Sequence, residues 1–247
     1  MPPFPRAKLD LPPGAPERIR AHLDRCRLAI AEAAKRAGRN PATVALLAVT
    51  KYVGPDAVRV LHDLGLRDFG ESTVQGIDTK IEALGDLEGL RWHLIGHLQR
   101  NKVARALQLA RAIHSVDSAR LVEEISAQSA RRSLPVPKLF VEVNLTGEGQ
   151  KTGLPEHDLA DLLRRIRSDP RLSPRLGGLM AMAPHSDDPE AARPTFRRLR
   201  ELRDQMRAQS LLEADGLSMG MSGDFEVAIE EGATIVRVGS TLFENLG

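Results

Sequence analysis

Apolar residues gather along the chain in eight short runs separated by longer stretches of mixed polarity. The first run, V-A-L-L-A-V at residues 44–49, is unbroken and has β-branched residues at both ends. A run of this kind is typical of a strand buried on both faces of a parallel sheet. Further strands are predicted at residues 67–69, 92–95, 112–116, 138–144, 176–182, 217–219 and 234–238.

Between these runs, apolar residues recur at steps of three and four, which predicts amphipathic helices. One helix precedes the first strand, from about Pro16 to Gly38, and each strand is followed by another helix. Eight such βα units in about 250 residues predict an α/β protein with a closed (β/α)8 TIM barrel. The alternative is a doubly wound open sheet, although no G-x-G-x-x-G follows the first strand. We expect a Pro-rich flexible tail over residues 1–15 and one barrel domain over 16–247, with no further domain.

Composition narrows the classes of partner. The net charge of the 247 residues is +2, which gives no argument for nucleic acid or a membrane surface. The arginines at 197, 198, 200 and 203 favour a solvated helix face over a phosphate-backbone footprint. The single cysteine, Cys26, belongs to the apolar stripe of the first helix, so a core thiol is predicted. The sequence shows no signal peptide, no membrane-spanning apolar stretch and no second cysteine for a disulfide, so we expect a cytoplasmic protein. The seven histidines show no metal-ligand spacing, so no metal site is predicted.

In barrels of this class, functional groups lie at the carboxyl ends of the strands. Lys51 follows the first strand there, and a lysine at a desolvated barrel mouth is a common source of a Schiff-base amine. The alternative is a rim lysine whose ammonium simply reaches water.

The loops after the last two strands carry small residues and hydroxyls. One contains Ser222 and Gly223, and the other contains Gly239 and Ser240. Backbone amides and hydroxyls in these two loops often bind phosphate. Ordinary helix capping by Ser222 and Ser240 is the alternative.

A lysine and a phosphate site across one mouth suggest pyridoxal phosphate (PLP) as the cofactor. Arg237, on the last strand, could then face the pyridine nitrogen, or it could form a salt bridge with Glu71 or Glu142. His93 points into the barrel, either as part of the pocket or as a hydrogen-bonded interior residue.

Several motifs resemble those of the pyridoxal phosphate homeostasis proteins, which are similar to the alanine racemase N-terminal domain standing alone. The motifs are L-L-A-V-T-K, D-F-G-E-S, W-H-L-I-G-H-L-Q-R-N-K, V-N-L-T-G-E-G-Q-K-T-G, G-L-M-A-M-A-P, M-G-M-S-G-D and V-R-V-G-S-T-L-F, over residues 16–243. The resemblance implies a fold-type III PLP barrel with the Schiff base on Lys51 and Arg237 at the ring nitrogen. It also implies cofactor-binding roles for the other residues of the site: Ser72 (where the family commonly has Asn), His93, Met221, Ser222, Gly223, Gly239 and Ser240.

The resemblance implies a carrier or regulator of intracellular PLP without robust turnover. We expect a monomer, with PLP-dependent apo-enzymes as recipients of the cofactor. An amino-acid racemase is the alternative, but it needs a second base. The single tyrosine, Tyr52, is adjacent to Lys51, so the two side chains should diverge if the strand continues that far. A third possibility is an isomerase or aldolase in which Lys51 would bind a carbonyl substrate.

Overall fold

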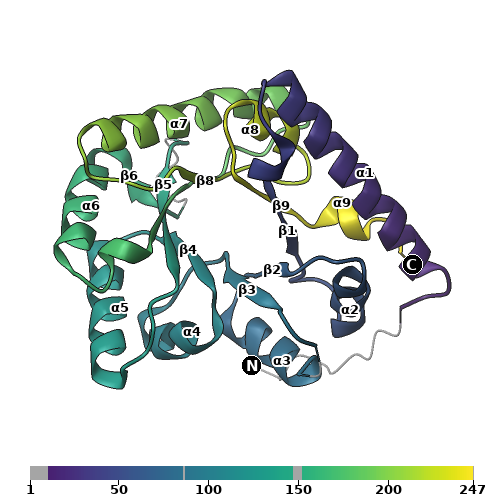
Figure 1. Cartoon of the computed structure of the whole chain (residues 1–247), viewed down its shortest axis with the longest axis horizontal. Helices are drawn as coiled ribbons and strands as arrows, with labels where there is room; N and C mark the ends of the chain where they lie inside the picture. The colour runs from purple at the N-terminus through teal and green to yellow at the C-terminus, as the bar shows by residue number, and fades with distance from the viewer. Residues whose placement is uncertain (1–10, 86, 147–151, 247) are drawn as a thin grey trace.

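Eight parallel strands close into a barrel in the computed structural model, which describes residues 11–85, 87–146 and 152–246. The strand order is β4-β3-β2-β1-β9-β8-β7-β5, and pairing of β4 with β5 closes the ring. Figure 1 shows the helices around the outside of this ring. The predicted (β/α)8 barrel is therefore confirmed. The strands are β1 (Ala45–Val49), β2 (Asp68–Glu71), β3 (Arg91–Leu94), β4 (Ala112–Val116), β5 (Lys138–Asn144), β7 (Leu176–Met180), β8 (Gly216–Ser218) and β9 (Ile235–Val238), and the two-residue β6 (Leu154–Pro155) pairs with the end of β5.

The helices follow the strands in the predicted alternation. The additional N-terminal helix, α1, packs against α2, α8 and α9. The helices are α1 (Ala15–Arg36), α2 (Pro55–Asp63), α3 (Val74–Ala83), α4 (Val103–Leu109), α5 (Ala119–Arg132), α6 (Leu159–Ser168), α7 (Arg193–Ala208), α8 (Phe225–Glu230) and α9 (Ser240–Phe243). Short 3-10 turns are η1 (Pro41–Thr43), η2 (Arg100–Lys102), η3 (Glu156–Asp158), η4 (Ser173–Arg175) and η5 (Pro189–Ala192).

Several strand boundaries differ from the prediction by one or two residues. The second strand was predicted over residues 67–69, but β2 extends through Gly70 and Glu71, because Gly70 O accepts from Thr50 N (3.0 Å) and Glu71 O accepts from Ile95 N (2.9 Å). The strand at 138–144 was predicted to be followed by a helix, but Pro155 first pairs with Asn144 in the β5–β6 ladder, and α6 begins after it. Residues 1–10 of the predicted tail, and 147–151 of the polar loop after β5, lie outside the described residues.

The core has an outer and an inner part. The outer part lies between strands and helices and includes the buried Cys26, which confirms the predicted core thiol. The inner part fills the barrel with Ala112, Phe140 and Met180. Close strand approach explains Gly178, which has φ +145°; a Cβ there would lie 1.9 Å from Gly216 O.

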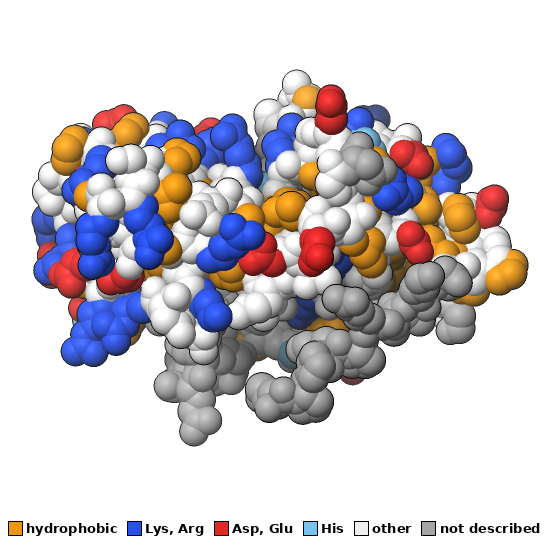
Figure 2. Space-filling model, turned by 90° about the horizontal axis from the view of Figure 1, so that it is seen from below, with side chains coloured by type: hydrophobic (Ala, Val, Ile, Leu, Met, Phe, Trp, Pro, Cys, Tyr) orange, Lys and Arg blue, Asp and Glu red, His pale blue; other side chains and the backbone are white. Residues whose placement is uncertain are grey.

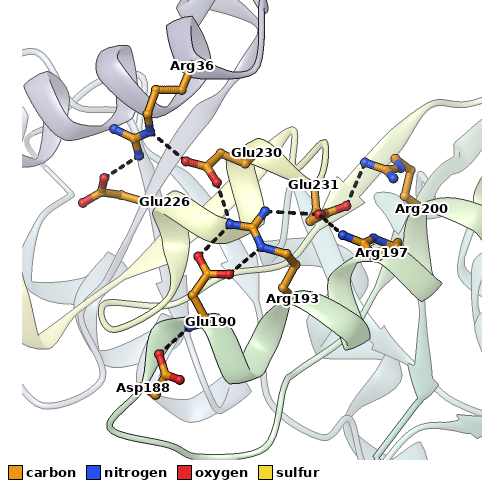
Figure 3. Close-up of polar contacts among 9 residues, drawn as sticks. All are labelled: Arg36, Asp188, Glu190, Arg193, Arg197, Arg200, Glu226, Glu230 and Glu231. Atoms are coloured by element: carbon orange, nitrogen blue, oxygen red, sulfur yellow. Dashed lines mark hydrogen bonds and ion pairs between the residues drawn. The ribbon is translucent and has the colours of Figure 1, made fainter.

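Ion pairs join α1, α7 and α8 on the outside of the barrel (Figure 3). Arg36 pairs with Glu226 and Glu230 of α8, and Arg193 of α7 bonds Glu230 (2.7 Å). Glu231 is buried and accepts contacts from three arginines of α7: Arg193, Arg197 and Arg200. This network ties the N-terminal helix to helices α7 and α8.

The arginine cluster of α7 is neutralised by carboxylates. Besides the contacts to Glu231, Arg198 pairs with Glu156 and Arg203 with Asp204. On the face drawn in Figure 2, basic and acidic side chains intermingle with hydrophobic ones. Among the described helices, none combines the length and apolar character needed to cross a bilayer.

Candidate functional site

Lys51 lies just beyond the carboxyl end of β1, in the turn that leads to α2. Its side chain is exposed, so the expected desolvated environment is not found. Its Nζ lies 4.8 Å from the centroid of the Tyr52 ring. Divergence was expected if the strand continued that far. Because β1 ends at Val49, strand alternation does not extend to residue 51, and the two side chains lie together.

A buried ion pair holds the backbone before Lys51. Lys80 Nζ lies 2.5 Å from Glu71 Oε1 and donates to Thr50 O (3.0 Å), while Thr50 Oγ1 donates to the same Glu71 oxygen (2.7 Å). All three side chains are buried. The end of β1, the end of β2 and helix α3 are thereby joined immediately behind Lys51.

The loops after β8 and β9 meet through one hydroxyl. Ser222 Oγ accepts from the amides of Gly239 (3.2 Å) and Thr241 (3.4 Å). Ser222, in the loop before α8, therefore caps the start of the other helix, α9. The N-cap position of α8 is occupied by Asp224, and Ser240 is the first residue of α9. Space remains beside this cluster, because a Cβ at Gly223 would meet nothing within 4 Å.

The same cluster adjoins the end of β1. A Cβ on Gly239 would lie 3.1 Å from Val49 O, two residues before Lys51. Strands β1, β9 and β8 are consecutive neighbours in the barrel, so Lys51, Gly239 and Ser222 share one sector of the mouth.

Arg237 lies inside the barrel and is buried. Nη1 donates to Ser218 O (2.7 Å) and Ser218 Oγ (2.8 Å), and Nη2 donates to Ala181 O (3.1 Å). The alternative salt bridge is not formed, because Glu71 pairs with Lys80 and Glu142 accepts from Thr152 (2.7 Å). Burial lowers the pKa of Arg237 to about 10, despite the opposing charges of Asp224 and Glu142, so it stays cationic at neutral pH.

His93 is hydrogen-bonded in the barrel interior. Its ring contacts His114 (2.9 Å) and Asp68 (3.1 Å), the first residue of β2. This arrangement agrees with the interior alternative; a direct role in the pocket stays a prediction.

Ser72 and Met221 lie on the rim. Ser72 is half-buried, and its backbone packs against Gly96, where a Cβ would lie 2.3 Å from Ser72 O. Met221 is 39% exposed after β8.

Inside the barrel, burial raises the pKa of Glu142, and its hydrogen bond from Thr152 opposes the shift.

Lys80, His114 and Ser218 were absent from the predicted site. Lys80 occupies the apolar stripe of α3 beside Ile77, and a lysine in such a stripe indicates a buried partner. His114 and Ser218 interrupt apolar strands, where a buried polar side chain signals an interior hydrogen bond.

Comparison with known proteins agrees with this architecture. Residues 22–245 match the family model for the alanine racemase N-terminal domain. A pyridoxal phosphate homeostasis protein from Aquifex aeolicus is 42% identical over 92% of this chain and 96% of that protein. One from Pseudomonas aeruginosa is 44% identical over 87% of this chain and 90% of that protein.

A solved structure extends the comparison to the fold. PipY of Synechococcus elongatus, determined with PLP bound, has a TM-score of 0.77 and 35% identity, over 87% of this chain and 99% of that one. The chain therefore belongs to the alanine racemase N-terminal domain family and, within it, to the pyridoxal phosphate homeostasis proteins.

Proposed function

We propose that this chain binds PLP in the barrel mouth and takes part in PLP homeostasis as a carrier or regulator. The observation that carries the proposal is that three groups of different chemistry gather at the neighbouring strands β1, β9 and β8. They are the exposed amine of Lys51, the amide and hydroxyl cluster around Ser222, and the buried guanidinium of Arg237.

These groups match the three polar parts of PLP. Lys51 supplies a primary amine to which the aldehyde attaches, and when bound the cofactor supplies an electron-withdrawing ring. The amides and hydroxyls of Ser222, Gly223, Gly239 and Ser240 suit the phosphate, since Gly223 leaves open space. Within the described residues, the Nε–H and one Nη2 hydrogen of Arg237 have no partner, which leaves donors for the ring nitrogen. Ser72, His93 and Met221 complete the proposed site.

The carrier role draws on the relatives, which are named homeostasis proteins. An exposed amine at an open rim suits a site that must release its ligand. PLP-dependent apo-enzymes are the proposed recipients, and a monomer is the proposed state.

The test is an absorbance titration of the purified protein with PLP, followed by borohydride reduction and peptide mapping. We expect a near-visible band and a reduced adduct on Lys51. Lys51→Ala should lose both, whereas Lys35→Ala, which removes an exposed lysine from α1, should keep both. A reduced adduct on Lys80 in the parent would contradict the assignment.

A further inference from the structure

A chain of hydrogen bonds crosses the barrel interior from Asp68 to Arg237. His93 Nε2 lies 3.1 Å from Asp68 Oδ1, and His93 Nδ1 lies 2.9 Å from His114 Nε2. His114 Nδ1 lies 2.8 Å from Ser218 Oγ, which in turn accepts from Arg237 Nη1 at 2.8 Å. The chain links β2, β3, β4, β8 and β9, and it connects the amino-terminal start of β2 with the buried guanidinium.

The two ends of the chain restrict the direction of its hydrogen bonds. At one end, desolvation alone would raise the pKa of Asp68, but hydrogen bonds from Arg91 and His93 outweigh it and hold that pKa well below its usual range. Asp68 is therefore a carboxylate that only accepts, so His93 Nε2 carries a hydrogen. At the other end, Arg237 has no acceptor lone pair, so Ser218 Oγ must accept from it.

With both histidines neutral, one arrangement satisfies every member. Ser218 Oγ accepts from Arg237 and donates its own hydrogen to His114 Nδ1. His114 Nε2–H then donates to His93 Nδ1, and His93 Nε2–H donates to Asp68. Burial lowers the pKa of His114 well below its usual range, and the nearby cation of Arg237 acts in the same direction, so a neutral ring is favoured. The reverse direction would leave the Ser218 hydroxyl hydrogen without this acceptor.

Aromatic packing holds His114 in place. Its ring stacks on Phe140 with centroids 4.5 Å apart and an interplanar angle of 15°. The stack fixes the ring plane, so Nδ1 stays aimed at Ser218.

Building on the proposed function, we propose that His114 is a positioning residue for Arg237. His114 Nδ1 accepts a hydrogen bond from the Ser218 hydroxyl. The Ser218 Oγ lone pairs are thereby turned towards Nη1 of the guanidinium, from which Oγ accepts. The Nη1 group is then anchored on Ser218, which leaves the Nε–H and the second Nη2 hydrogen for a ligand in the mouth.

The first experiment uses ligand-free, ¹⁵N-labelled protein. We expect Nε2-protonated tautomers for His93 and His114, and separate, slowly exchanging Nη resonances for Arg237. Ser218→Ala and His114→Leu should average those Nη resonances. His114→Asn should keep them, because its Oδ1 can accept from Ser218 where Nδ1 does, and so should Ser129→Ala, which removes a buried hydroxyl from α5. Averaged resonances in the parent, or no change in Ser218→Ala and His114→Leu, would overturn the proposal.

The second experiment measures PLP affinity in the same variants. We expect about tenfold weaker binding in Ser218→Ala and His114→Leu, since an anchoring hydrogen bond to a charged group is lost. His114→Asn and Ser129→Ala should bind as the parent does. Equal weakening in His114→Asn and His114→Leu would contradict the positioning role. Failure of the parent to bind PLP would refute the proposed function, while the ligand-free spectra would still decide the role of His114.

Discussion

Lys80 Nζ lies 2.5 Å from Glu71 Oε1 in the barrel wall, and it also donates to the carbonyl of Thr50. The pair is buried on both sides, with side-chain exposures of 8% and 3%. Because Thr50 directly precedes Lys51, the pair fixes the backbone from which the proposed cofactor lysine extends.

Replacing Lys80 by Met should destabilise the protein strongly. It leaves a buried, unpaired carboxylate, and breaking a buried pair in this way typically costs about 3–5 kcal/mol. Urea unfolding measures the change. Arg25→Met is the matched control, since Arg25 pairs with Glu244 on the surface at 62% and 46% exposure and should cost at most about 1 kcal/mol. Similar losses in the two variants would contradict the role of burial.

The arginine cluster around Glu231 predicts that removing the Glu231 charge changes how salt affects thermal stability (Figure 3). Glu231 has a side-chain exposure of 6% and faces Arg193, Arg197 and Arg200 at 3.2, 3.3 and 2.8 Å. Glu231→Gln removes the carboxylate charge shared by the three arginines, while Arg193 keeps Glu190 and Glu230 as partners. Repulsion among the three guanidinium groups therefore increases, so added salt should stabilise this variant more than the parent. Thermal unfolding at low and high salt measures this, with Glu201→Gln, at the half-exposed partner of Arg198, as the control. An unchanged salt response in Glu231→Gln would contradict the prediction.

Cys26 predicts a loss of stability at alkaline pH. Burial raises the pKa of its thiol from 9.0 to about 11, with Arg25 opposing and Glu244 adding to the shift. Because the folded pKa is the higher one, the stabilisation is complete below pH 9 and is lost as the pH rises towards 11. Unfolding free energies of the parent should therefore fall more steeply over this window than those of Cys26→Ala. Parallel curves would show that the thiol titrates alike in both states.

The sequence predicted the barrel well because its strands are continuous apolar runs separated by helical spacing. The limits are visible at particular residues. Tyr52 was placed by strand alternation, which fails once β1 ends at Val49. The partner of Arg237 was sought among carboxylates, whereas Ser218 and Ala181 supply neutral oxygens from β8 and the segment after β7. Such cross-barrel contacts depend on strand order and register, which local patterns do not encode.

Gly239 should tolerate no side chain at the proposed phosphate cluster. A Cβ there would lie 3.1 Å from Val49 O and 3.2 Å from Val49 Cβ, and the Gly239 amide already points to Ser222 Oγ. Gly239→Val should therefore weaken PLP binding several-fold or more. Ser240→Ala should cost about 1.5–3 kcal/mol if its hydroxyl donates to the phosphate.

The control for this series is Gly85→Ala, where the added methyl would meet only Ile81 O at 3.4 Å. Fluorescence or absorbance titration gives the affinities. Parent-like binding by both Gly239→Val and Ser240→Ala would place the phosphate elsewhere.

The loaded protein should not turn over amino acids at an enzyme-like rate. A two-base racemase needs acid–base groups on opposite faces of its substrate. The only tyrosine of the chain, Tyr52, lies beside Lys51, with Nζ 4.8 Å from its ring centroid, and is therefore placed on the same side as the lysine. Arg237 keeps its proton at neutral pH, since its pKa falls only to about 10, and a fixed cation disfavours protonation of the ring nitrogen.

The measurement is Cα exchange of L-alanine, L-serine and L-glutamate in deuterated water, with detection of the D-isomers. We expect rates well below about one per second, the lower end of ordinary enzyme turnover. Lys51→Ala is the control for exchange by free PLP. Faster exchange that disappears in Lys51→Ala would contradict the carrier role and favour the racemase. The first residue to test as the second base would then be Glu142, a buried carboxyl of β5 whose pKa is raised by burial.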